Sequence, residues 1–272
     1  MSLHVYDDLE QGSEDWLAAR RGIVTASAVG QLVTTTHPDA TEVGCPDCGA
    51  EVYSPCVSRA RKQVAPIKSL HPGRIRLAQD LEPVVTLANN DTSRALTMLL
   101  AAERITGWSD PVFVNNDMAR GTFEEPIARD VYAEHYAPVA EVGFMVRDDW
   151  GFPIGYSPDG LVDDDGLIEI KSRRQKKHLQ TILRDEVPAE NMGQLQAGLL
   201  VSGRAWIDYV SFCGGMPLYV KRVYPDPQWL EAILAAVRRF EDAAAEIVAT
   251  YHQAVIGRPT TERTLYDLEV VI

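Results

Sequence analysis

The stretch SPDG (157–160), followed further along the chain by EIK (169–171), decides the fold class and the chemistry of this sequence. The Asp-Gly pair is typical of a turn, which places Asp159 between two strands. Glu169 and Lys171 are two residues apart, so on a strand their side chains point to the same side. The pattern therefore predicts that two carboxylates and one amine meet at neighbouring strand positions.

This grouping of charges is suited to a divalent metal ion. Carboxylates on adjacent strands form the oxygen-rich site that Mg²⁺ or Mn²⁺ prefers, and the carbonyl oxygen of Ile170 can add a ligand. A lysine beside the ion can orient or help to deprotonate a water that attacks a phosphodiester. The alternative is a plain turn at Asp159 and a solvent-facing pair, Glu169 and Lys171, on an edge strand. The apolar neighbours and the strand, turn, strand setting favour the metal site.

The segments around this motif show both strand and helix patterns. Residues 141–171 contain short apolar runs separated by DDWG and DDDG, which predicts consecutive antiparallel strands joined by tight turns. Two further strand-like runs are AWIDYVSF (205–212) and LYVKRVY (218–224). Helical spacing of apolar residues covers 13–21, 92–106, 117–136, 191–201 and a last helix that starts at Asp226-Pro227. We therefore expect a fold of the α/β (α+β) class.

The composition is that of an ordinary globular protein. With 272 residues, 46% of them hydrophobic, the chain can bury one good core, and we expect one main domain with an appendage. No apolar run approaches the roughly 20 residues that span a bilayer, and the N-terminal stretch is acidic. These features predict a cytoplasmic protein that makes no use of a membrane.

The net charge of −13 argues against a nonspecific nucleic-acid coat, because phosphates repel acidic surfaces. Positive charge is nevertheless gathered in two clusters, each of which can be either a solvated face or a contact surface for DNA. The first cluster consists of Arg59, Arg61, Lys62, Lys68, Arg74 and Arg76, and the second of Arg173, Arg174, Lys176 and Lys177.

Residues 37–90 form a loop-like stretch that is rich in Pro, Gly and Cys. A loop of this length needs a function, or something other than a core to hold it. Cys45 and Cys48 form a CPxCG pair typical of a zinc knuckle, and Cys56 and His71 can complete a tetrahedral Cys₃His site. Free cysteines are the alternative, and a disulfide is less expected in the cytoplasm.

Zinc would order a segment that is too poor in apolar residues to fold by itself. The segment resembles small zinc-binding modules of actinobacterial and phage proteins. Since its basic residues follow Cys56, we expect it to touch DNA. The fourth cysteine, Cys213, lies in a strand-like run and is expected in the core.

Five motifs along the chain, including SPDG and EIK, resemble those of the lambda exonuclease and YqaJ-like viral recombinase family, within the PD-(D/E)XK nuclease superfamily. In the family's order, these motifs are WLAARRGIVTAS (16–27), RGTFEEPIAR (120–129), SPDG, EIK and MGQLQ (192–196). The resemblance implies a restriction-endonuclease-like core with a central mixed β-sheet flanked by helices. That core would comprise residues 1–36 and 91–272, with 37–90 as an inserted zinc-binding module that the usual family pattern lacks.

The resemblance also implies a role for each motif. Arg20 and Ser27, with Ser157 as a further hydroxyl donor, would hold the 5′ phosphate of the substrate. Glu125 would be the first acidic metal ligand, with the neighbouring Glu124 as an alternative, and Gln194 would face the active site. The expected Mg²⁺ ligands are Glu125, Asp159, Glu169 and the carbonyl of Ile170, and Lys171 completes the catalytic set.

The implied activity is a metal-dependent DNA exonuclease. It would digest linear double-stranded DNA in the 5′-to-3′ direction and leave a 3′ single strand for a single-strand annealing partner. Members of the family are commonly toroidal trimers, so a homo-oligomer that encloses the duplex is expected. One alternative is a PD-(D/E)XK endonuclease or a Cas4-like nuclease. Another is a catalytically silent zinc-containing protein for DNA binding or assembly, although the intact Asp159, Glu169 and Lys171 set argues against it.

Overall fold

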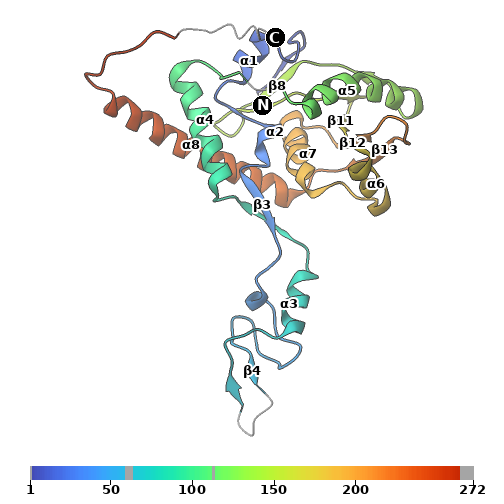
Figure 1. Cartoon of the computed structure of the whole chain (residues 1–272), viewed down its shortest axis with the longest axis vertical. Coiled ribbons are helices and arrows are strands. Elements are labelled where there is room, and N and C mark those ends of the chain that lie inside the picture. The colour runs from blue at the N-terminus through green and yellow to red at the C-terminus, as the bar shows by residue number, and fades with distance from the viewer. Residues whose placement is uncertain (1, 59–63, 112–113, 264–272) are drawn as a thin grey trace.

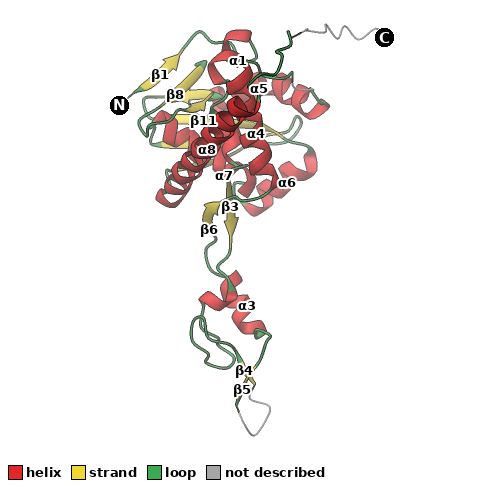
Figure 2. Cartoon of the chain, turned by 90° about the vertical axis from the view of Figure 1, so that its left-hand side faces the viewer, coloured by secondary structure: helices red, strands yellow, loops and turns green. Residues whose placement is uncertain are grey.

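The computed structural model describes residues 2–58, 64–111 and 114–263, which form a body and a long projecting arm (Figure 1). The arm is attached to the body by β3 (Val33–Thr36) and β6 (Val84–Leu87), which Figure 2 shows side by side. These strands pair in an antiparallel manner, with Val33 opposite Leu87. The arm therefore leaves the body and returns to it at one place.

A five-stranded mixed sheet forms the centre of the body, in the order β13-β12-β11-β10-β7. Its strands are β7 (Val139–Ala140), β10 (Gly160–Val162), β11 (Gly166–Ser172), β12 (Trp206–Phe212) and β13 (Tyr219–Val223). β11 and β12 are parallel, whereas the other neighbours are antiparallel. α6 (Gln175–Arg184) and α7 (Ala189–Ser202) supply the crossover that parallel pairing requires. The expected mixed sheet flanked by helices is confirmed.

The strands predicted within 141–171 are divided between two sheets. β8 (Phe144–Arg147) and β9 (Ile154–Tyr156) belong to a four-stranded sheet with β1 (Leu3–Tyr6) and β2 (Val24–Thr25), in the order β1-β8-β9-β2. β10 and β11 pair in the five-stranded sheet. The predicted antiparallel pairs are therefore right, but the continuous series is wrong, because the chain changes sheets between β9 and β10. That change of sheets occurs at residues 157–159, and it brings Asp159 to the junction of the two sheets.

Different helices cover the two faces of β11. Ile168 belongs to a small core cluster with Tyr132 of α5 (Asn116–His135). Leu167 belongs to the main core, together with Leu195 of α7. Because side chains alternate along a strand, Glu169 shares the side of Leu167 and is directed toward α7.

The other helices of the body begin and end close to the predicted positions. They are α1 (Glu14–Arg20), α4 (Asp91–Thr106) and α8 (Pro227–Ala254), whereas the short α2 (Ala26–Val29) and α6 were not predicted. Ser13 caps α1 by accepting a hydrogen bond from the backbone N–H of Trp16, and Asp226 caps α8 in the same way. α4 packs against α8. Of the helices described, none is both long enough and apolar enough to cross a bilayer.

The arm contains more regular structure than the sequence predicted. Besides β6, its elements are a 3₁₀ turn (Ala40–Glu42), the short hairpin of β4 (Val57–Ser58) and β5 (Ala65–Pro66), and α3 (Pro72–Gln79). The sequence pattern did not predict α3, because this helix is fixed by polar contacts and has no apolar stripe. The backbone N–H of Gly73 donates to Asp47 at 2.8 Å, and Arg74 is fully buried.

Candidate functional site

A cavity of about 380 Å³ lies where β11, α5, α7 and the N-terminal elements meet. The structure brings together in its lining every residue that the sequence assigned to the catalytic centre and to the 5′ phosphate. These residues are Arg20, Ser27, Glu125, Ser157, Asp159, Glu169, Ile170, Lys171 and Gln194. Motifs spread over 175 positions of the sequence, from Arg20 to Gln194, therefore form one surface.

Glu169 is the most deeply buried acid in this lining, at 1% exposure. Its Oε1 atom accepts hydrogen bonds from Lys171 Nζ at 2.8 Å and from Gln194 Nε2 at 2.5 Å. Its Oε2 atom accepts one from the hydroxyl of Tyr156 at 3.3 Å. Tyr156, which the sequence did not single out, is buried, and burial raises the pKa of its hydroxyl well above the usual range. It is therefore a neutral donor that fixes the carboxylate.

The environment of Asp159 and Glu125 disfavours their ionised forms. Burial, reinforced by the charges of Glu169 and Glu125, raises the pKa of Asp159 well above its usual range. Burial also raises the pKa of Glu125, although Arg129 opposes this effect. For Lys171, burial acts to lower the pKa, but the charges of Glu169 and Asp159 outweigh it, and the amine stays protonated. Three carboxylates thus lie close together, with Lys171 paired to Glu169 and Arg129 paired to Glu125, and their crowding favours a further bound cation.

Arg129 is a second residue that the sequence did not assign, and it connects two of the acids. Its Nη2 atom donates to Glu125 Oε1 at 2.6 Å, and its Nε atom donates to the main-chain oxygen of Asp159 at 2.8 Å. Arg129 ends the RGTFEEPIAR motif one helical turn after Glu125, which is the spacing at which two side chains on a helix meet. That spacing was the signal available in the sequence.

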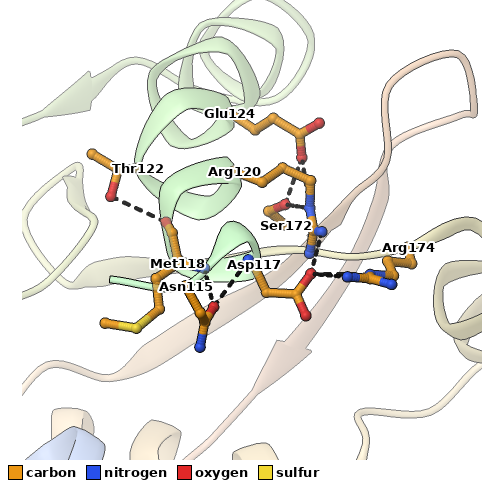
Figure 3. A network of polar contacts seen from close by, with 8 residues as sticks. All are labelled: Asn115, Asp117, Met118, Arg120, Thr122, Glu124, Ser172 and Arg174. Carbon is orange, nitrogen blue, oxygen red and sulfur yellow. Dashed lines mark hydrogen bonds and ion pairs between the residues drawn. The ribbon is translucent and has the colours of Figure 1, made fainter. Parts of the chain in front are cut away.

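Of the two neighbouring glutamates on α5, only Glu125 lines the cavity. The carboxylate of Glu124 instead accepts a hydrogen bond of 2.5 Å from the hydroxyl of Ser172, within the network shown in Figure 3. The geometry therefore favours Glu125 as the residue that meets Asp159 and Glu169.

The residues expected at the 5′ phosphate form a linked group of donors. The guanidinium of Arg20 lies over the ring of Trp16, 4.0 Å from its centroid, and donates to the hydroxyl of Thr25 at 3.3 Å. The Thr25 and Ser27 hydroxyl oxygens are 3.2 Å apart. The Trp16 indole N–H donates to the Ser157 hydroxyl at 2.9 Å. Trp16 and Thr25 were not assigned from the sequence, yet they hold the three predicted residues in place.

The predicted zinc ligands meet in the arm. One ligand atom from each of Cys45, Cys48, Cys56 and His71 lies within 4.8 Å of all the others. Tetrahedral zinc, with bonds of about 2.3 Å to sulfur and about 2.0 Å to nitrogen, needs ligands at roughly this spacing. Gly49 completes the knuckle with a left-handed φ of 72°, and its N–H donates to the Cys45 oxygen. Four soft and borderline donors in this arrangement fit zinc.

The thiol of Cys48 loses its proton more readily than an ordinary cysteine thiol. Hydrogen bonding from backbone N–H groups, first that of Val57, lowers its pKa to about 6. Cys213, by contrast, is buried outside this cluster, as the sequence predicted.

The first basic cluster does not form one exposed face. Arg74 is fully buried and donates to the main-chain oxygens of Thr41, Val43, Glu51 and Ser54. Its Nη1 atom also lies 3.7 Å from Cys56 Sγ. The interpretation of Arg74 as a DNA-contacting or solvated residue is therefore wrong. Lys68 and Arg76 are exposed, and Arg59, Arg61 and Lys62 lie outside the described residues.

Comparisons with known families and structures extend this description. The model of the YqaJ-like viral recombinase domain matches residues 68–205, just over half of the chain. The model of a phage zinc finger domain, to which DNA binding is ascribed, matches residues 11–89. No curated protein sequence gives a match.

Three solved structures are similar to most of the chain. The alkaline exonuclease LHK-Exo from Laribacter hongkongensis is 25% identical, with a TM-score of 0.65, and the match covers 90% of this chain and 98% of that one. Its complex with dAMP gives a TM-score of 0.63 at the same identity and coverage. A phage-related exonuclease from Haemophilus somnus 129PT is 14% identical, with a TM-score of 0.51 over 84% of this chain and 96% of its own, and it supports the fold alone.

Proposed function

Because the chain belongs to the YqaJ-like viral recombinase family, we propose that it is a phage-type exonuclease that hydrolyses the phosphodiester bonds of linear double-stranded DNA. One observation carries the proposal: the acids of three separate motifs, the paired lysine and the expected phosphate-binding side chains all line one cavity. The likeness to an alkaline exonuclease over nine-tenths of the chain supports it.

The donor set of the cavity fits Mg²⁺ or Mn²⁺. Glu125, Asp159 and Glu169 supply hard oxygen ligands, and the carbonyl of Ile170 can add a fourth. Burial and mutual repulsion raise the pKa values of Asp159 and Glu125 despite the nearby Lys171 and Arg129, as expected for crowded carboxylates that a further cation would stabilise. A bound ion would stabilise the negative charge that develops on the phosphate and make a water more acidic.

The chain's own residues have distinct parts in this proposal. Lys171, held as a cation against Glu169, orients the attacking water or the phosphate oxygen beside it. Gln194 keeps the Glu169 carboxylate in place from α7. The Arg20, Ser27 and Ser157 group binds the terminal 5′ phosphate, and this contact would set a 5′-to-3′ direction. LHK-Exo was solved with dAMP, a nucleoside monophosphate, and release of such products from this chain is the corresponding expectation.

The wider assignments follow from the same proposal. We divide the chain into an exonuclease domain, 1–36 and 91–272, and an inserted Cys₃His zinc module, 37–90. The expected partners are DNA ends, two further copies of the chain in a trimeric ring, and a protein that anneals the 3′ single strand. If the chain is phage-encoded, it would act in the host cytoplasm.

Digestion of three duplexes in Mg²⁺ tests the proposed function. The duplexes carry 5′-phosphate ends, carry 5′-hydroxyl ends, or are closed circles without ends. We expect mononucleotides from the linear substrates, fastest from the phosphorylated one, and no product from the circle. Cutting of the circle would indicate an endonuclease, and the absence of any cleavage would leave only a binding protein.

A further inference from the structure

Two arginines from different helices converge on one carboxylate oxygen beside the cavity (Figure 3). Arg120 Nη1 lies 2.5 Å from Asp117 Oδ1, and Arg174 Nε and Nη2 lie 3.0 and 2.9 Å from the same oxygen. Arg120 belongs to α5, whereas Arg174 is the N-cap of α6. Asp117 and Arg174 are 57 positions apart in the sequence. Their contact is therefore a result of the tertiary fold and not of the spacing of side chains along one helix.

Ser172 links this arginine pair to the cavity. Arg120 Nε donates to the Ser172 hydroxyl oxygen at 2.8 Å. Ser172 follows Lys171 on β11, and it lines the cavity together with Gly121 of α5. Arg120 therefore stands next to the groups proposed to cut the phosphodiester.

The pairing with Asp117 is open to exchange. The side chains of Asp117 and Arg174 are 54% and 71% exposed. Water screens such a pair, so it adds little to stability, and another anion can replace the carboxylate at small cost. Planar guanidinium groups match phosphate oxygens well, because each presents a fork of N–H donors. An oxygen that receives three such donors occupies the position that a phosphate oxygen would take.

We propose that Arg120 and Arg174 form a phosphate clamp for the DNA strand under digestion, and that Asp117 occupies this clamp when DNA is absent. The inference rests on the function proposed above. Arg20 and Ser27, at another part of the same cavity, are assigned to the terminal phosphate. The clamp then holds a later phosphate of that strand, on the 3′ side of the bond that is cut. It gives a role to one residue of the second basic cluster.

Asp117 has two effects in the clamp. It keeps two guanidinium groups close together that would otherwise repel each other, so the clamp is formed before DNA arrives. It also competes with phosphate for the same donors, which weakens binding to any polyanion. The proposal therefore predicts opposite consequences for loss of the arginine and loss of the carboxylate.

Equilibrium binding tests the arginine. Fluorescence anisotropy would follow a labelled linear duplex with 5′-phosphate ends, with every protein in an Asp159→Asn background so that the DNA stays intact. We expect Arg174→Ala to weaken binding about tenfold and to lower the slope of log K against log salt concentration by about one. The matched control is Arg184→Ala, at the other end of α6, which removes the same charge from an exposed arginine. Its effect should be under about twofold. Equal losses in the two variants would overturn the clamp.

The carboxylate is tested in the same assay. We expect Asp117→Asn to strengthen binding severalfold, because a competing anion is removed. Glu186→Gln, which neutralises the exposed partner of Arg184, controls for the change in net charge and should leave affinity nearly unchanged. Weaker binding by Asp117→Asn, or an equal gain in the control, would contradict the competition.

Failure of the clamp and failure of the proposed function are separable. Wild-type digestion of linear DNA tests the function without reference to Arg174. If the wild type digests DNA and Arg174→Ala binds as tightly as its control, only the clamp fails. If the wild type cuts nothing and the clamp variants still behave as expected, only the nuclease assignment fails.

Discussion

The cavity of the body and the cysteine cluster of the arm each gather groups that carry negative charge when ionised, but they do so by different means. Glu169 and its neighbours stand on a strand whose two faces are covered by helices, and Ile168 and Leu167 beside it are fully buried. The described residues of the arm form no such core. Their buried cluster consists of Cys45, Cys48 and Cys56 with a few partly buried apolar residues.

The two regions would therefore depend on a metal in different ways. In the body, hydrophobic burial holds the carboxylates together against their repulsion, so the proposed ion would serve chemistry and not folding. In the arm, the ligands are themselves the centre of the structure, so zinc is needed for the fold. Removal of single groups should accordingly cost activity in the body and structure in the arm.

The largest expected effect is the loss of cleavage in Asp159→Ala or Glu169→Ala. Removal of a metal ligand costs several kcal/mol of transition-state stabilisation, which corresponds to about a thousandfold in rate. Both variants should remain folded, although Glu169→Ala leaves Lys171, Gln194 and Tyr156 without their buried acceptor and should lower the melting temperature. Glu134→Ala, an exposed acid on α5, is the control and should retain activity. Near-normal digestion by either purified variant would sink the assignment of the cavity.

The next effect is structural and confined to the arm. The wild type should contain one zinc per chain, and Cys48→Ser should lose it, with rapid proteolysis between residues 37 and 90 while the body stays folded. Cys213→Ser is the matched control, because this cysteine is buried outside the cluster. Elemental analysis of protein purified without added metal measures the zinc. Less than about a tenth of an equivalent in the wild type would refute the site, since zinc binds such clusters with roughly 10–16 kcal/mol.

A smaller effect concerns the 5′ end. Arg20→Ala should digest phosphorylated and hydroxyl ends at similar rates, whereas the wild type should prefer the phosphorylated end about ten- to a hundredfold, the value of a charge-assisted contact. Arg21→Ala, one residue further, controls for loss of positive charge. The ratio of initial rates on the two ends is the measurement. If Arg20→Ala kept the wild-type ratio of rates on phosphorylated and hydroxyl ends, the 5′-phosphate pocket would have to lie elsewhere.

Local patterns predicted much of this molecule. The spacing of Glu169 and Lys171, the position of Asp159 between two strands and the helix caps at Ser13 and Asp226 depend on a few neighbouring residues, and each appears in the structure as expected. Resemblance to a family supplied Arg20, Ser27 and Gln194, which no local pattern could bring to the cavity.

What the sequence could not predict depends on long-range contacts. The division of the strands between two sheets is decided by pairing with β1 and β12, far away in the chain. Trp16 and Tyr156 look like ordinary core aromatics until their polar atoms are seen against Ser157 and Glu169. Arg74 was grouped with surface cations because charge in a sequence gives no sign of burial.

The smallest expected effect that distinguishes the arm from the body concerns Arg74. It is the buried cation of the arm, and its carbonyl partners come from the segments on both sides of the knuckle. Arg74→Ala should leave these acceptors unsatisfied and weaken zinc binding about tenfold in competition with a chromogenic chelator. Arg76→Ala, on the exposed side of the same helix, should bind zinc as the wild type does.

The substitution Arg74→Lys separates the two parts of this contribution. Lysine keeps the positive charge near Cys56, but it lacks the planar guanidinium with which Arg74 donates to four carbonyl oxygens. If charge balance with the thiolates dominates, Arg74→Lys should bind zinc like the wild type. If the hydrogen bonds dominate, as the four short contacts indicate, it should resemble Arg74→Ala. In either case digestion by the body should change far less than zinc affinity, because its carboxylates are held by a core that Arg74 does not touch. Equal losses of zinc binding and of cleavage would mean that the two regions are not independent.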